Sequence, residues 1–176
     1  VLCTGLGPGL DFSQAGSLPP ELDGKRFYLA VGIYKRHKNW DFLLENMAKV
    51  LPDDAWFAAA GTGKSNETIT ELARKHGLRR FIALPHLDEA SMAATCMAAE
   101  ALVHASCAEG FGLPVLEAMS AGTPIILADR APMREIARDS ALLFDPEDGA
   151  DFARAFKQFL TDTDERARLC ENGKRR

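Results

Sequence analysis

Short apolar runs alternate with stretches of helical periodicity along most of the chain. The apolar runs predict strands at 27–31, 55–60, 80–84, 100–104, 124–127 and 141–144. Apolar residues spaced three and four apart predict helices near 40–51, 65–76, 88–98, 113–121, 132–138, 149–160 and 164–172. Strands that alternate with helices are typical of βαβ units and a parallel sheet. The pattern therefore predicts an α/β fold, a Rossmann-like three-layer domain with a central parallel sheet of about six strands.

Several predicted helices have chemical signals at their ends. Asp148 is placed to cap the helix that buries Phe152, Ala155, Phe156 and Phe159. Gly77 and Gly122 directly follow two other periodic stretches, where a left-handed glycine commonly ends a helix. In open parallel sheets ligands bind beyond the carboxyl ends of the strands. That rule directs attention to the loops 32–39, 61–65, 84–88, 105–113 and 128–132.

The first 24 residues differ from the rest in composition. They contain three closely spaced glycines at positions 5, 7 and 9 and the pair Pro19-Pro20. This composition predicts an extended lead-in rather than regular structure. We therefore divide the chain into a linker at 1–24 and one folded domain at 25–176.

Composition and charge exclude several classes of protein. Hydrophobic residues make up 47% of the 176 residues, which is enough for a core, and the formal net charge is −4. A nucleic-acid-binding protein would show a basic face, whereas the only dense basic run here, at 174–176, is at the chain end. No apolar run has the length of a transmembrane helix, and no signal peptide is recognisable. We expect a cytoplasmic protein that does not bind nucleic acid.

Cysteines and histidines give no sign of a metal site. The four cysteines (Cys3, Cys96, Cys107 and Cys170) form no Cys-x-x-Cys pair, and the four histidines (His37, His76, His86 and His104) lack the spacing of metal ligands. Buried free thiols in a reducing compartment are the plain interpretation. The sequence predicts no metal.

Two glycine-rich segments resemble nucleotide-binding motifs without completing them. The segment 61–65 ends like a P-loop, but the first glycine of that motif is replaced by Ala58. The glycines at 5, 7 and 9 lack the spacing of a dinucleotide fingerprint, and Pro8 interrupts the turn. A linker explains the second segment better.

The segment 109–119, Glu-Gly-Phe-Gly-Leu-Pro-Val-Leu-Glu-Ala-Met, follows a buried strand and opens a helix. Pro114 suits the first helical position, where its missing N–H has no partner to lose. Gly110 and Gly112 allow the backbone to approach whatever lies above the strand end. The free N–H groups and the positive end of the helix then favour an anion such as a diphosphate.

Two carboxylates flank this turn. Glu109 precedes the helix, and Glu117 lies inside it with a side chain that points back toward the N-terminus. Carboxylates accept hydrogen bonds from the vicinal hydroxyls that ribose and hexoses offer. Both acids are therefore placed to face one ligand at different points along its length. The alternative is that they are solvated charges near a helix start.

The same segment resembles the Glu-x7-Glu motif of the large retaining glycosyltransferase group with the GT-B architecture (family 4), and matches its common form throughout. The resemblance continues in 121–126, in 31–32 with 38–39, in 61–63 and in 144–146. It implies that the chain is one half of a GT-B fold, the donor-binding C-terminal domain. The chain does not begin with Met, and 1–9 is similar to the interdomain linker of the family. We therefore expect an N-terminal domain, which supplies the acceptor site, to be missing.

The resemblance also implies functions for individual residues. Glu109 would contact the donor sugar as the catalytic residue, and Glu117 would bind the ribose. Lys38 would neutralise the donor diphosphate together with the backbone amides of Gly110, Phe111, Gly112 and Leu113. Members of the family usually carry an Arg near this lysine; here His37 takes that place, and Arg36 is the preferred helper. Pro85 and His86 would border the base, although ordinary loop packing explains them equally well.

For the intact enzyme the resemblance implies transfer of a hexose from a UDP- or GDP-sugar to a glycan or lipid-linked acceptor with retention, in surface polysaccharide or lipopolysaccharide synthesis. It implies no cofactor, and it is compatible with peripheral association of the full-length enzyme with the inner face of the membrane. The isolated chain would bind donor weakly and be inactive. Two alternatives stay open: a nucleotide-sugar epimerase of the same two-domain architecture, and a non-catalytic nucleotide-sugar-binding module.

Overall fold

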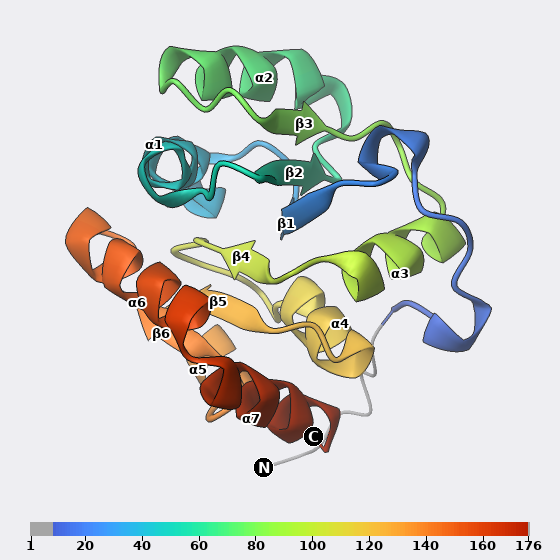
Figure 1. Cartoon of the computed structure of the whole chain (residues 1–176), viewed down its shortest axis with the longest axis vertical. Helices are drawn as coiled ribbons and strands as arrows, with labels where there is room; N and C mark the ends of the chain where they lie inside the picture. Colours follow the sequence, from blue (N-terminus) through green and yellow to red (C-terminus); the bar gives the residue numbers. More distant parts are fainter. Residues whose placement is uncertain (1–8, 176) are drawn as a thin grey trace.

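A six-stranded, fully parallel sheet lies between two layers of helices in the computed structural model, which describes residues 9–175 (Figure 1). The strands are β1 (Arg26–Val31), β2 (Ala55–Ala60), β3 (Phe81–Ala83), β4 (Leu102–His104), β5 (Ile125–Ala128) and β6 (Leu142–Phe144). Their order across the sheet is β3-β2-β1-β4-β5-β6. The predicted α/β class and the predicted parallel sheet are confirmed.

The helices follow the predicted alternation. They are α1 (Trp40–Val50), α2 (Asn66–Lys75), α3 (Glu89–Ala98), α4 (Leu113–Ala121), α5 (Met133–Ala137), α6 (Gly149–Thr161) and α7 (Thr163–Lys174). Most ends lie within two residues of the prediction. Helix α4 begins at Leu113, so Pro114 occupies the second helical position instead of the first. Its missing N–H has no partner inside the helix at either position.

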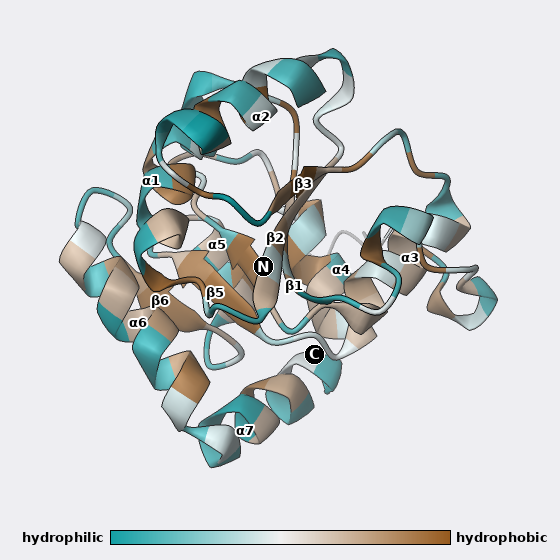
Figure 2. Cartoon of the chain, turned by 45° about the horizontal axis from the view of Figure 1, so that its top comes forward, coloured by the Kyte–Doolittle hydropathy of each residue, from teal (hydrophilic) through white to brown (hydrophobic). Residues whose placement is uncertain are grey.

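The sheet separates two hydrophobic cores because successive side chains of a strand point to opposite faces. Tyr28 and Ala30 of β1 join the core under α1, α2 and α6. Phe27 and Leu29 join the core under α3, α4 and α5. Figure 2 shows the consequence: strands β5 and β6 are hydrophobic, whereas the outer surface of α2 is mostly hydrophilic.

The predicted helix ends are confirmed. The side chain of Asp148 accepts hydrogen bonds from the amides of Ala150, at 2.8 Å, and Asp151, at 3.3 Å, and so caps α6. Gly122 ends α4 with a φ of +72°, a conformation that other residues adopt only with strain. Gly77 follows α2 with a φ of +78°. These ends are encoded by neighbouring residues alone, which is why the sequence predicts them.

The lead-in is less extended than its composition predicts. Residues 9–24 contain two short 3-10 turns, at Phe12–Gln14 and Pro20–Leu22. The side chain of Leu22 is fully buried in the core under α3, and the amide of Gly16 donates to the carbonyl of Ala90 at 2.9 Å. Apolar residues in a Pro-rich segment gain more by packing against the domain than by exposure to water. Residues 1–8 lie outside the described residues, and the boundary at 24/25 stays a prediction.

The strand order places one crevice at the centre of the sheet. The chain runs from β1 outward to β3, returns to β4 beside β1, and then continues outward to β6. The loops after β1 and β4 therefore leave the sheet in opposite directions. Ligands of open parallel sheets bind at such a switch point. None of the helices in residues 9–175 combines the length and hydrophobicity that a membrane crossing requires.

Candidate functional site

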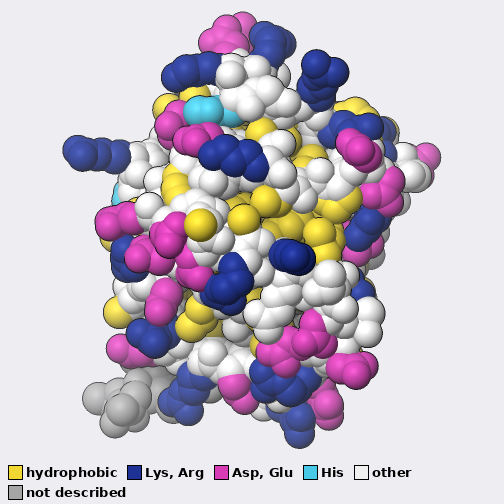
Figure 3. All heavy atoms as spheres, turned by 60° about the vertical axis from the view of Figure 1, so that its left-hand side comes forward, with side chains coloured by type: hydrophobic (Ala, Val, Ile, Leu, Met, Phe, Trp, Pro, Cys, Tyr) yellow, Lys and Arg dark blue, Asp and Glu magenta, His cyan; other side chains and the backbone are white. Residues whose placement is uncertain are grey.

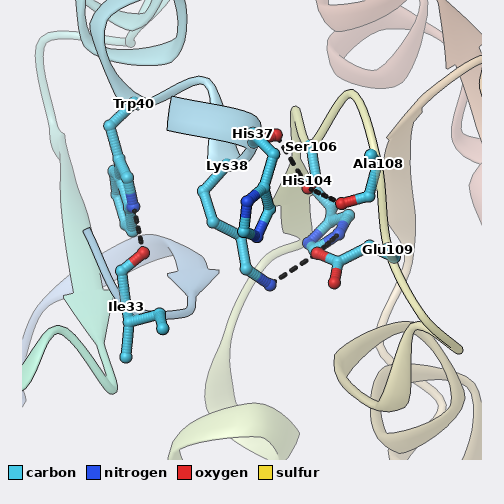
Figure 4. Close-up of polar contacts among 8 residues, drawn as sticks. All are labelled: Ile33, His37, Lys38, Trp40, His104, Ser106, Ala108 and Glu109. Atoms are coloured by element: carbon cyan, nitrogen blue, oxygen red, sulfur yellow. Dashed lines mark hydrogen bonds and ion pairs between the residues drawn. The ribbon is translucent and has the colours of Figure 1, made fainter. Parts of the chain in front are cut away.

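The loops that follow β1 and β4 are joined to each other at the switch point. The backbone carbonyl of His37 accepts hydrogen bonds from the amide of Cys107, at 2.8 Å, and from the hydroxyl of Ser106, at 3.0 Å. The hydroxyl of Ser106 also lies 3.1 Å from the carbonyl of Ala108 (Figure 4). These contacts fix the 3-10 turn Arg36–Lys38 against the segment that leads into Glu109.

Lys38 and Glu109 meet in this crevice as an ion pair. The Nζ atom of Lys38 lies 2.5 Å from Oε1 of Glu109, and the two side chains are only 13% and 11% exposed. Gly32 makes room for the lysine: a Cβ added there would lie 3.1 Å from Cε of Lys38 and 3.2 Å from its Nζ. A larger residue directly after β1 would have to adopt a strained φ of +142° and would displace the end of the lysine side chain.

His104 is the second partner of Glu109. It is the last residue of β4, is 3% exposed, and places Nε2 at 3.1 Å from the same Oε1 atom (Figure 4). Burial raises the pKa of Glu109, but hydrogen bonds from His104 and Lys38 and the charge of Lys38 outweigh it and lower the pKa to about 2. Glu109 is therefore a carboxylate throughout the physiological pH range.

The turn between Glu109 and α4 carries backbone N–H groups without a partner in residues 9–175. Within the described residues no hydrogen bond engages the amides of Gly110, Phe111, Gly112 or Leu113. Gly112 has a φ of +79°, which turns the chain into the helix and favours glycine at this position. A Cβ added at Gly110 would meet no atom within 4 Å, so the space above that residue is open. Such a group of donors at a helix N-terminus attracts an anion.

Glu117 lies apart from this ion pair. It sits inside α4, and its Oε1 atom is 3.3 Å from the position of a Cβ added at Gly9. Burial raises the pKa of Glu117. Burial, with a smaller contribution from the charge of Glu117, raises the pKa of the Cys96 thiol to about 12. Within residues 9–175, no hydrogen bond or ion pair joins Glu117 to Lys38, His104 or Glu109.

The other predicted residues are more peripheral. Arg36 is exposed and lines, with His37, Asn39, Cys107 and Glu147, a hollow of about 480 Å³ next to the crevice. Pro85 and His86 are exposed in the loop after β3, which is an edge strand. None of these three predicted residues forms a hydrogen bond or an ion pair with Lys38 or Glu109 in the described chain.

Sequence reasoning missed His104. The histidines show no metal-ligand spacing, and the neighbours of His104, Leu102 and Val103, are core residues. The available signal was its position at the carboxyl end of a strand that leads to Glu109, because such ends carry ligand-binding residues. Cys96 is a buried free thiol as expected, whereas the free thiols Cys107 and Cys170 are only half-buried, because Cys107 lies in the loop after β4. Residues 9–175 contain no group of three or more His, Cys, Asp or Glu arranged to hold a metal ion.

This geometry defines a class of protein: a Rossmann-like domain whose switch point combines a cation, a carboxylate and free helix-start amides. The sequence profile described as "Glycosyl transferases group 1" matches residues 19–176. The chain belongs to that glycosyltransferase family.

Two curated relatives carry names of glycosyltransferases. A D-inositol 3-phosphate glycosyltransferase of Geodermatophilus obscurus is 34% identical over 164 residues, which cover 84% of this chain and 35% of the relative. The O-antigen chain mannosyltransferase RfbU of Salmonella typhimurium is 29% identical over 136 residues, which cover 76% of this chain and 38% of the relative. The chain thus spans little more than a third of the length of either relative.

Among solved structures, sucrose-phosphate synthase from Thermosynechococcus elongatus superposes with a TM-score of 0.79 at 23% identity. The match covers 95% of this chain and 45% of that structure. The chain therefore has the fold of one half of a GT-B glycosyltransferase, as the sequence predicts.

Proposed function

We propose that this chain is the donor-binding half of a hexosyltransferase. The intact enzyme would move a hexose from a UDP- or GDP-sugar to a glycan or a lipid-linked acceptor with retention of the anomeric configuration. The observation that carries this proposal is the convergence of Lys38, Glu109 and four unengaged amides at one switch point. Family membership and an O-antigen mannosyltransferase among the relatives support it.

In this proposal the diphosphate binds at the start of α4. The amides of residues 110–113 and the ammonium group of Lys38 neutralise its charge, aided by Arg36 from the neighbouring hollow. The same groups stabilise the charge that develops on the departing nucleoside diphosphate. Because these groups supply positive charge without a metal ion, the proposed site needs no metal. Glu109 faces the sugar, Glu117 faces the ribose, and Pro85 with His86 borders the base.

The acceptor site belongs, in this proposal, to a further domain, so this chain alone binds donor weakly and transfers no sugar. A setting in surface polysaccharide or lipopolysaccharide synthesis, in the cytoplasm at the inner face of the membrane, fits the named relatives. An epimerase would release an altered sugar without an acceptor, and a binding module would release none. Assays of the full-length protein with UDP-, GDP- and ADP-sugars, with and without acceptor, separate the three.

Donor binding by this chain is the direct test. We expect isothermal titration calorimetry to detect binding of UDP or GDP, with the same affinity in EDTA as in Mg²⁺. A dissociation constant that rises at least tenfold when EDTA is added would show that a metal is required. Absence of binding by both nucleotides would contradict the proposed site.

Replacing Lys38 by Ala will weaken nucleoside diphosphate binding about 10- to 100-fold, which corresponds to a hydrogen bond between charged groups of about 1.5–3 kcal/mol. Binding of the bare nucleoside will change less than twofold, because a nucleoside carries no phosphate. Calorimetry with UDP and uridine, or GDP and guanosine, measures the two losses. The matched control is Lys75→Ala, which removes an exposed lysine of α2. Equal losses for diphosphate and nucleoside would remove Lys38 from the diphosphate site.

A further inference from the structure

One oxygen atom of Glu109 is held twice. Both Lys38 Nζ and His104 Nε2 lie within hydrogen-bond distance of Oε1, at 2.5 and 3.1 Å. The hydroxyl of Ser106 adds a weaker hydrogen bond to the same carboxylate, and Figure 4 shows the second oxygen, Oε2, pointing away from Lys38 and His104. If Glu109 served only as a counter-ion to Lys38, it would not need a hydrogen bond from His104.

The two partners differ in how firmly they are held. His104 ends strand β4 and is in register with Leu127 of β5, and its ring is almost fully buried. Lys38 ends a 3-10 turn in a loop, and its ammonium group is carried by a flexible four-carbon stem. The histidine is therefore the fixed partner, and the lysine is the movable one.

An anion at the start of α4 changes the balance between these partners. In the proposed site a nucleoside diphosphate, which carries more negative charge than one carboxylate, binds to the amides of residues 110–113 beside Lys38. The ammonium group is then drawn toward the phosphate oxygens, and Glu109 loses part of its cationic support. A carboxylate without that support swings toward water unless another donor holds it.

We propose that His104 is a positioning residue, which keeps Glu109 in place through Oε1 when Lys38 turns to the diphosphate. This inference rests on the proposed function of the site. The N–H group at Nε2 of His104 donates a hydrogen bond to Oε1 of Glu109. This hydrogen bond keeps Oε2 directed into the open part of the crevice. There it accepts a hydrogen bond from a sugar hydroxyl. In the free chain Lys38 pairs with Glu109. When the diphosphate draws Lys38 away, the hydrogen bond from His104 keeps the carboxylate of Glu109 in the same orientation.

Two substitutions separate donation from packing. His104→Gln retains an amide N–H donor at about the reach of Nε2, whereas His104→Leu fills similar space without a donor. Folding of both variants is checked by circular dichroism. The carboxyl group of Glu109 is then titrated by NMR in ¹³C-glutamate-labelled chain, free and saturated with UDP or GDP, whichever binds the wild type more tightly.

We expect His104→Leu to raise the pKa of Glu109 by about one unit in the free chain and by clearly more in the nucleotide-bound chain. His104→Gln will stay close to the wild type in both states, and all three proteins will bind the nucleotide within twofold of one another. A shift of equal size in the free and bound states would overturn the inference while leaving the proposed function intact. A wild-type chain that binds neither nucleotide would overturn both.

Discussion

Replacing Glu109 by Gln will lower the free energy of unfolding by about 2–3 kcal/mol at pH 6 and by less than about 0.5 kcal/mol at pH 2. The folded-state pKa of Glu109 is about 2, below its ordinary value of 4.5. A carboxyl group with a lowered pKa stabilises the fold above its unfolded-state pKa and loses that contribution as the pH falls through the folded-state value. The full pKa shift corresponds to about 3 kcal/mol of stability. Contact of the Glu109 carboxylate with water reduces this contribution slightly. Urea unfolding of both proteins between pH 6 and pH 2 measures the difference.

Gln is suited to this test because its carbonyl oxygen still accepts hydrogen bonds from Lys38 and His104 while its side chain does not titrate. The control is Glu45→Gln, which removes an exposed acid whose partner Lys49 lies one helical turn away. Its stability difference will vary by less than about 0.5 kcal/mol over the same range, as is typical of exposed ion pairs. Parallel pH profiles for the wild type and Glu109→Gln would show that the ion pair does not form in solution.

The parts of the fold that the sequence predicts are those with a local cause. The alternation of apolar runs and helical periods is visible in any window of about ten residues. The cap at Asp148 and the left-handed glycine at position 122 depend only on neighbouring residues. The packing of the lead-in escaped prediction because Gly16 bonds to Ala90 of helix α3, which lies far along the chain.

The same distinction holds for the site: its local features are predicted from the sequence, and its long-range contacts are not. The Glu-x7-Glu segment is contiguous, so the glycine-containing turn that we propose to bind the diphosphate is visible in the sequence. The contact between Lys38 and Glu109 joins residues 71 positions apart, and it depends on β1 lying beside β4. Periodicity predicts that both strands exist but not that they are neighbours. His104 was missed because the sequence around the end of a buried strand looks like the sequence of a core strand. Only the contact with Glu109 distinguishes His104 from a core residue.

Replacing Phe152 by Ala will lower the free energy of unfolding by about 3–5 kcal/mol, a large share of the total of a single domain. Phe152 is fully buried in α6, where its ring centroid lies 4.9 Å from that of Phe144 and 6.0 Å from those of Phe42 and Phe156. The truncation leaves a cavity among three aromatic rings that rigid neighbours do not fill. Because Phe42 belongs to α1, which begins directly after the loop of Lys38, this cluster also anchors one side of the proposed site.

Two further substitutions show whether the loss comes from this cluster. Phe152→Leu retains most of the buried apolar surface and will cost about 1–2 kcal/mol. Met97→Ala removes a side chain that is 52% exposed and will change the unfolding free energy by less than about 0.5 kcal/mol. Urea denaturation followed by circular dichroism measures all three. A loss below about 1 kcal/mol for Phe152→Ala would mean that α6 is not packed against α1 and the sheet, since full burial of a phenylalanine contributes more than that.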